Sequence, residues 1–389
     1  MKGDGEEAEH IAYGSTLSSD GFASNDFDFM LSNPPYGKSW KTDAEKMGGK
    51  DEILDTRFVT MFGDDPEFSM IPRTSDGQLL FLLNNISKMK ETTEMGSRIV
   101  EVHNGSSLFT GDAGSGESNA RRYMIERDLV EAIIALPENM FYNTGIGTFI
   151  WILSNKKEER RRGKIQLIDA TAMKSSLRKN LGKKNCEFTE EIRKEILELY
   201  LNMTENEISR IFNNNEFGYW SITVERPLRL RAFPDRYIPV DTFKNDEEYL
   251  TATRALANLP QDIVLDDWPA FSEATKLKAA LLKKIRPFIT EVDPTAMAID
   301  EADPDLRDTE IVPFTYAGGI TAFMKNEVLP FANDAWVNDK KTVVGYEVSF
   351  TKYFYKPVDL RAMEDIIAEI GLLEKETAGL LEEIIGGNK

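Results

Sequence analysis

The chain has 389 residues, of which 41% are hydrophobic, enough for two or three domains with cores of their own. Its formal net charge of −19 argues by itself against a nucleic-acid partner, because phosphates are bound by Lys and Arg. One cysteine and two histidines exclude a disulfide framework and most metal centres. Every apolar run is far shorter than the roughly 20 residues that cross a bilayer, so a soluble, cytoplasmic protein without metal or membrane contact is expected.

Short apolar runs alternate with helical patterns over the first 187 residues. Between two of them, Leu79, Leu82, Leu83 and Ile86 recur at helical spacing behind a possible cap at Ser75-Asp76. Such alternation is typical of an α/β fold with a mostly parallel sheet and helices on its faces. The runs that predict strands are residues 11–17, 27–31, 98–102, 130–136, 148–154 and 164–169.

Basic residues gather between Lys156 and Lys184, while most of the excess acid lies beyond that stretch. The pattern favours contact with DNA or a partner over a solvated linker, because the basic residues are nearly unopposed. Arg121 and Arg122 are weaker candidates, since a solvated helix face explains them as well. The phosphate-binding candidates within the run are Arg160, Arg161, Arg162, Lys179, Lys183 and Lys184.

A mostly helical second module is expected over residues 188–340. Ile192, Ile196 and Leu199 are spaced as on one helix face, and the segment Thr204-Glu207 has the pattern of a capping box that begins another helix. The role of this module is not indicated by any motif.

The last segment, residues 341–389, is expected to hold a strand or hairpin arm followed by a partner-binding helix. The alternation over residues 342–355 predicts the strand. Residues 231–338, before it, carry no motif that can be interpreted. The helix has a heptad-like spacing of apolar residues at Met363, Ile366, Ile370, Leu373, Leu380 and Ile384.

The sharpest signal is a buried strand that runs straight into Asn33-Pro34-Pro35-Tyr36. Neither proline has an N–H, and each disfavours the helical region for the residue before it, so Asn33 and Pro34 are held extended with acceptor oxygens outward. Two such acceptors would take both hydrogens of an aromatic amine such as that of adenine and free its nitrogen lone pair. Tyr36 could stack on a base that has left the duplex. The competing interpretation is a plain loop after a strand.

The motif and the text around it resemble a known family. Asn33-Pro34-Pro35-Tyr36 is similar to the catalytic motif of amino-group DNA methyltransferases. Residues 14–21, 104–109 and 135–145, together with Arg226-Pro227-Leu228, look like the modification subunit of type I restriction-modification systems. The resemblance implies a Rossmann-like, S-adenosylmethionine-dependent DNA adenine methyltransferase. It also implies a separate DNA-specificity subunit and a restriction subunit as partners.

The resemblance also implies roles for individual residues. Asn33 and Pro34 would be the amine acceptors and Tyr36 the stacking aromatic. Phe141, or less favourably Tyr142, would pack against the flipped base, although Phe141 suits a core position equally well. The resemblance further implies that the last helix pairs with the helical spacer of the specificity subunit.

The family binds its cofactor through a glycine-rich turn and an acidic residue, both ahead of the catalytic strand. Only 32 residues precede Asn33, so residues 1–187 are expected to form the target-base half of the core without that motif. An amino-terminally truncated chain is therefore expected, and alone it could be inactive. Ser15 and Asp20 are the possible adenosine contacts that remain.

A second glycine-rich segment, residues 111–116, also resembles a cofactor loop. Gly114 and Gly116 precede a predicted helix over residues 119–126, and a permuted enzyme could use them. The strand over residues 98–102 ends well before Gly114, however, whereas the fingerprint requires a tight strand-to-helix turn.

Two other functions stay open. One is a non-catalytic protein that only binds the specificity subunit. The other is an amino-methyltransferase acting on an RNA adenine or a protein glutamine, which the long carboxy-terminal region makes less favourable.

Overall fold

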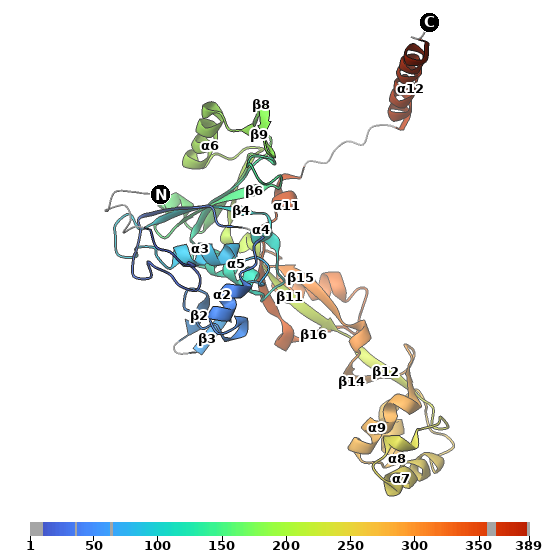
Figure 1. Ribbon diagram of the computed structural model, residues 1–389. Helices are drawn as coiled ribbons and strands as arrows, with labels where there is room; N and C mark the ends of the chain where they lie inside the picture. Colours follow the sequence, from blue (N-terminus) through green and yellow to red (C-terminus); the bar gives the residue numbers. More distant parts are fainter. Residues whose placement is uncertain (1–10, 36, 63–64, 356–362, 387–389) are drawn as a thin grey trace. The chain divides into compact units, whose positions relative to one another are not determined.

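The computed structural model describes residues 11–35, 37–62, 65–355 and 363–386 (Figure 1). The chain divides into two compact units, residues 1–348 and residues 349–389. Within the described ranges, none of the helices combines the length and the apolar character needed to span a bilayer.

A six-stranded sheet forms the centre of the first unit, in the order β1-β4-β6-β5-β7-β10. The pairs β1/β4 and β5/β7 are parallel, whereas β6 and β10 run antiparallel to their neighbours. Four of the six strands therefore run the same way, and the expected α/β core with a mostly parallel sheet is confirmed. The strands are β1 (Phe29–Ser32), β4 (Arg98–Asn104), β5 (Val130–Ala135), β6 (Thr148–Ser154), β7 (Lys164–Asp169) and β10 (Ser209–Asn213).

Helices cover both faces of this sheet (Figure 1). On one face lie α3 (Gln78–Ile86), α4 (Ser106–Phe109) and α5 (Gly116–Glu126), and on the other lies α6 (Glu190–Asn202). Because both faces are covered, all six residues of β5 are buried. Buried and exposed residues therefore do not alternate along this strand.

The helix α6 forms as its sequence predicts. The Thr189 side chain caps it by accepting from the backbone N–H of Ile192. Ile196 and Leu199 then fall on one side and join a buried cluster with Ile134 of β5.

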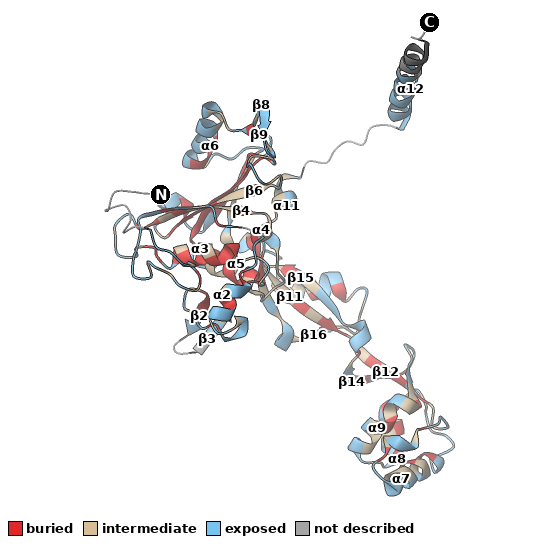
Figure 2. Ribbon diagram, in the orientation of Figure 1, coloured by how far each residue is buried: buried red, intermediate tan, exposed pale blue. Residues whose placement is uncertain are grey.

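Strand β1 lies at the edge of the sheet and is paired with β4 alone among the described strands. Met30 points into the core, whereas Phe29 and Leu31 are 69% and 82% exposed. Figure 2 shows how far each part of the chain is buried.

Two predicted elements are wrong. Residues 11–17 form turns and bends, not a strand. The segment after Thr204 is not a helix: Asn206 Oδ1 accepts from the N–H groups of Ile208 and Ser209 at 2.9 Å, and this turn leads directly into β10. Since β10 pairs with β7, the main sheet continues past residue 187, where the sequence suggested a boundary.

A second, antiparallel sheet follows the first. Its central strand is β11 (Gly218–Glu225), which pairs with β15 (Asp308–Pro313), β16 (Trp336–Val337) and β17 (Val343–Tyr346). The strand predicted over residues 342–355 is present only in its first part, because β17 ends at Tyr346 and residues 350–354 form a helix. Residues 188–340, expected to be mostly helical, hold several helices but also strands of three sheets, including β10, β11 and β15.

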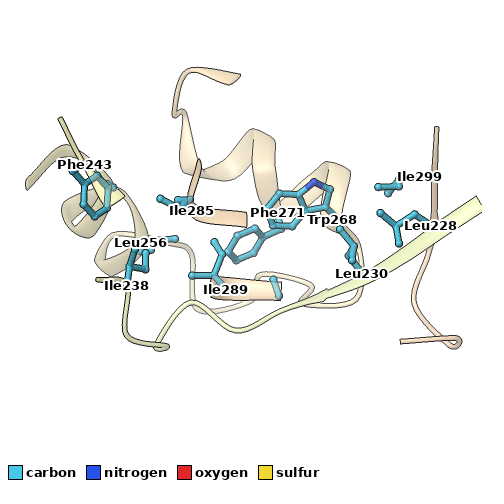
Figure 3. Packing of buried hydrophobic residues seen from close by; sticks show 12 residues of the cluster. Leu228, Leu230, Ile238, Phe243, Leu256, Trp268, Phe271, Ile285, Ile289 and Ile299 are labelled. Carbon is cyan, nitrogen blue, oxygen red and sulfur yellow. The ribbon is translucent and has the colours of Figure 1, made fainter. Parts of the chain in front are cut away.

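Between β11 and β15 the chain forms a small separate core. The strand β12 (Pro227–Ala232) pairs with β13 (Thr290–Val292) and β14 (Ala298–Ala302). Three helices pack against it, and Trp268 stacks on Phe271 with ring centroids 5.5 Å apart (Figure 3). These helices are α7 (Asp246–Ala257), α8 (Trp268–Thr275) and α9 (Ala279–Ile289).

The first unit also contains several short helices and strands. The described part of the second unit is helical. The second unit holds α11 (Phe350–Phe354) and the long α12 (Met363–Gly386), where the sequence predicts its last helix. Ile366, Ile370 and Leu373 of α12 are 42%, 53% and 61% exposed. The shorter elements of the first unit are α2 (Lys41–Lys46), β2 (Val59–Phe62), β3 (Asp65–Ser69), β8 (Ser175–Leu181), β9 (Lys184–Glu187) and α10 (Gly319–Phe323).

Candidate functional site

The Asn-Pro-Pro segment leaves the sheet at the carboxyl end of β1. The neighbouring parallel strand β4 ends at Asn104, on the same edge of the sheet. Open α/β sheets bind ligands at this edge. Asn33 and Pro35 are exposed and Pro34 is buried, whereas Tyr36, the predicted stacking residue, lies outside the described residues.

A cavity of about 680 Å³ opens at this point. Its volume falls in the range of about 300–1,000 Å³ that is usual for small-molecule sites. More than a hundred residues separate the Asn-Pro-Pro segment from the aromatic segment in sequence, and the fold brings them to one cavity. Its lining residues are Asn33, Pro34, Pro35, Gly37, Lys38, Asn104, Phe141, Tyr142, Asn143, Thr144 and Ile146.

The two predicted aromatics differ in their surroundings. Phe141 is half-buried and packs against the apolar cluster that includes Ile196 and Leu199 of α6. It also lines the cavity, so it has both the core contacts and the access to a base that the sequence left as alternatives. Tyr142 is 58% exposed, and Lys184 Nζ lies 5.9 Å from the centre of its ring. Phe141 is therefore the better fixed of the two rings.

The β8–β9 hairpin lies beside this aromatic segment. The N–H of Lys183 donates to the carbonyl of Tyr142 at 2.9 Å, and the N–H of Asn185 donates to the carbonyl of Asn139 at 3.0 Å. Lys179 and Lys183 are exposed, and within the described ranges no ion pair is recorded for either. The backbone of Lys183 therefore lies next to Tyr142, which lines the cavity.

Arg121, proposed from the sequence as a DNA contact, is fully buried, and that prediction is wrong. Its Nε donates to the carbonyl of Tyr346 at 2.6 Å and its guanidinium donates to the carbonyl of Ser107 at 3.1 Å. Burial lowers the pKa of Arg121 to about 10. The side chain instead ties α5 to the end of β17. Its neighbour Arg122 pairs with Glu126 at 3.0 Å.

The arginines at the start of the basic run are also committed to partners within the protein. Arg161 is 3% exposed, donates to the carbonyl of Tyr200 and stacks on its ring at 4.3 Å, so its predicted DNA contact is wrong as well. Arg160 and Arg162 are exposed but each has an acidic partner at 2.7 Å, respectively Glu158 and Glu159. Among the phosphate-binding candidates of the run, Lys179 and Lys183 are therefore exposed without an acidic partner in the described structure, unlike Arg160 and Arg162.

A polar network that sequence reasoning missed connects the two halves of the cavity wall. Asp76 Oδ1 accepts from the N–H of Gly37 at 3.2 Å, next to the Asn-Pro-Pro segment. The Gln78 amide nitrogen donates to Asp76 Oδ2 and to Asn104 Oδ1, both at 2.7 Å. Ser106 Oγ is 2.8 Å from Asp76 Oδ2. In the sequence, Asp76 appeared only as a helix cap.

The two residues suggested for adenosine make contacts within the protein. The Asp20 carboxylate accepts from Lys88 Nζ at 2.7 Å and from the N–H of Phe22 at 2.9 Å. Ser15 Oγ accepts from the N–H of Leu17 at 3.3 Å. Both side chains stabilise the turns that precede β1.

The glycines of the second candidate loop have packing roles. A Cβ at Gly116 would lie 1.8 Å from the carbonyl oxygen of Ile71, and one at Gly114 would lie 2.7 Å from Val343. Gly114 also has a φ of +79°, which favours glycine. Gly114, Gly116 and Asp20 are thus occupied by packing or by an ion pair and do not fit S-adenosylmethionine. Within the described ranges, His, Cys, Asp and Glu form no group of three or more that could hold a metal ion.

Comparison with known proteins gives a family match over more than half of the chain. Residues 1–225 match the family model described as N-6 DNA Methylase. The methylase subunit of the type I restriction enzyme MjaIX from Methanocaldococcus jannaschii is 24% identical over 230 residues, which are 57% of this chain and 36% of that protein. The MjaVII methylase subunit of the same organism is 45% identical over 58 residues, 15% of this chain and 10% of that protein.

Among solved structures, the chain is similar to the methyltransferase subunit of a type I restriction-modification system from Streptococcus thermophilus. That similarity has 25% identity and a TM-score of 0.41, and it covers 52% of this chain and 38% of the other. The match thus spans about a third of the length of the first relatives, 36% and 38% respectively.

Proposed function

Since the chain belongs to the N-6 DNA methylase family, we propose that it carries the target-base side of the catalytic site of an adenine-specific methyltransferase of a type I restriction-modification system. One observation carries the proposal. The acceptors of the Asn-Pro-Pro segment and the rings of Phe141 and Tyr142 line a single cavity at the carboxyl edge of the sheet. That cavity offers acceptors for an amine and apolar rings for a flat base.

The chemistry of the site follows from these groups. Asn33 Oδ1 and the carbonyl of Pro34 accept the two amine hydrogens of the base. These bonds favour a pyramidal nitrogen, whose lone pair is then no longer delocalised into the ring and can attack an electrophile. The site needs no covalent intermediate, because it acts by orienting the amine and by preorganised acceptors. S-adenosylmethionine is the methyl donor implied by the family, and of the four candidate residues Asp20, Gly114 and Gly116 are committed to contacts within the protein.

The base must leave its duplex to reach the cavity, and the hairpin supplies the charge for that DNA. A flipped base is held by stacking in a pocket, while the flanking phosphates need positive charge. Lys179 and Lys183 are exposed and free of acidic partners in the described structure, and the backbone of Lys183 bonds to Tyr142 of the aromatic segment. We assign DNA contact to them and not to Arg121 or Arg161.

The partner subunits are proposed on separate grounds. Apolar side chains of α12 are exposed at heptad-like spacing, which suits pairing with a helix of another chain. We propose the DNA-specificity subunit as that partner, with the restriction subunit joining the same complex. The recognised sequence would then be set by the partner.

The catalytic proposal is tested by Asn33→Ala in the full complex, with adenine methylation of duplex DNA measured by mass spectrometry. Loss of one acceptor should lower kcat by about 100-fold or more, by analogy with the removal of one preorganised hydrogen bond. Asn258→Ala, in an exposed position at the end of α7, is the matched control and should keep full activity. Retained methylation in Asn33→Ala would remove the residue from the mechanism. Transfer only to RNA or to a glutamine peptide would overturn the DNA assignment.

A further inference from the structure

We propose that Asn104 reads the target base: its amide nitrogen donates a hydrogen bond to a ring nitrogen of the purine whose amine is held by Asn33 and Pro34. This inference rests on the proposed function and adds a substrate-binding residue to it. Asn104 is the last residue of β4 and lines the same cavity as Asn33.

The orientation of the Asn104 amide follows from a chain of hydrogen bonds that starts at Asp76. A carboxylate can only accept, so the Gln78 group that meets Asp76 Oδ2 at 2.7 Å must be its NH₂. The same NH₂ lies 2.7 Å from the Asn104 side chain, which must therefore present its oxygen. The Gln78 oxygen accepts from the Asn104 backbone N–H at 3.1 Å, which agrees with this assignment.

The oxygen of Asn104 is then fully used within the protein. It also accepts from the backbone N–H of Ser106 at 3.0 Å. A flipped amide would place its NH₂ against the donors of Gln78 and Ser106 and would lose both bonds. The Nδ2 group is left as the free end, and in the described part of the chain it has no recorded acceptor. Asn104 is only half-buried, so this donor is available to the cavity.

Adenine has a ring acceptor on each side of the amine that Asn33 and Pro34 would hold. Its amine is flanked on one side by N7, an acceptor, and on the Watson–Crick edge by N1, also an acceptor. The Asn-Pro-Pro segment presents acceptors for the amine, and Asn104 presents a donor on the adjacent strand. The two strands together therefore match the alternation of donor and acceptor on the edge of an amino-purine, and they fix the rotation of the base in its plane.

The test is a double-mutant cycle on binding, which needs no methyl donor. The full chain is titrated with single-stranded oligonucleotides that carry adenine, 7-deazaadenine or 1-deazaadenine at one position, and affinity is measured by fluorescence anisotropy. With the wild-type chain, one of the two deaza bases should weaken binding by about 10-fold, the loss expected for one hydrogen bond. With Asn104→Asp, which keeps an oxygen for Gln78 and removes the donor, that same deaza base should cost less than about 2-fold.

The possible outcomes distinguish a failure of the Asn104 role from a failure of the proposed methyltransferase function. If the wild-type chain does not prefer an adenine oligonucleotide over an abasic one, the proposed function fails and Asn104 falls with it. If the preference exists but the deaza penalties are equal in wild-type and Asn104→Asp, only the role of Asn104 is overturned. Asn258→Ala should keep the full deaza penalty, and thermal unfolding of each variant shows that it is folded.

Discussion

Asp20 ties the turns before β1 to the body of the core. Burial acts to raise the pKa of its carboxyl, but the hydrogen bond from Lys88, the N–H of Phe22 and the nearby charge of Arg57 together lower it below its ordinary value of 3.8. Asp20 therefore holds its charge more firmly in the folded protein than in the unfolded chain.

This pKa gives a prediction about stability. A carboxyl with a lowered folded-state pKa stabilises the protein above its unfolded pKa, and that contribution is lost as the pH falls through the folded value. Asp20→Asn should lower the free energy of unfolding at pH 7 by on the order of 1 kcal/mol. The difference from wild-type should shrink below pH 3.8, as measured by urea unfolding at several pH values. Asp28→Asn, whose carboxylate pairs with Lys90 but is 53% exposed, is the control with a smaller effect. A difference that does not change with pH would contradict the assignment.

Single residues also mark the limit of prediction from sequence. Asn33 and Phe141 could be proposed because their types and their spacing from strands carry the information, and both line the cavity. Arg121 and Arg122 could not be told apart, because the partners that bury Arg121 are carbonyls of Tyr346 and Ser107, which the fold alone brings near. The role of Asn104 was not predicted either, because Gln78, which orients its amide, comes near it only in the folded chain.

At the scale of elements, the lysines of the β8–β9 hairpin and the arginines at residues 160 and 162 differ in their ion pairs, and this difference can be tested. Lys179→Ala with Lys183→Ala should weaken DNA binding and make the slope of log affinity against log salt shallower by about 1.8, since each phosphate contact contributes about 0.9. Titrations of duplex DNA by anisotropy at several salt concentrations measure both effects.

The matched control for the hairpin is Arg160→Ala with Arg162→Ala. Their guanidinium groups already pair with Glu158 and Glu159 at 2.7 Å, so this pair should change the slope far less. Equal effects of the two double variants would mean that net charge alone matters. The hairpin would then lose its specific role.

Elements were predictable where the pattern was long or fully buried. The strands at residues 148–154 and 164–169 have the bounds expected from their apolar runs, and α6 has the expected face. The segment around Thr204 was mistaken for a helix start because the Asn206 turn uses the same residue types as a helix cap. Residues 209–213 form a strand because they pair with β7. Pairing between strands that are distant in sequence is not visible in a local pattern.

At the scale of the whole molecule, α12 is the described surface best suited to a partner. Ile366→Glu with Ile370→Glu places two charges on its exposed apolar side and should abolish co-purification with the specificity subunit, because burying unpaired charge is costly. Size-exclusion chromatography of the co-expressed proteins measures the complex. Glu374→Gln, on the same helix, should leave it intact, and survival of the complex in the double variant would exclude this helix as the interface.

The exposed edge of β1 has a consequence for the protein in solution. An edge strand presents unpaired N–H and C=O groups, and here Phe29 and Leu31 add apolar surface at 69% and 82% exposure. Natural sheets usually shield such an edge with charge, proline or a covering segment. Whatever covers β1 therefore also acts as a solubility factor. When no other segment covers this edge, copies of the chain should associate through β1 as their concentration rises. Light scattering at several protein concentrations would then show whether the edge is covered, without an assay of catalysis.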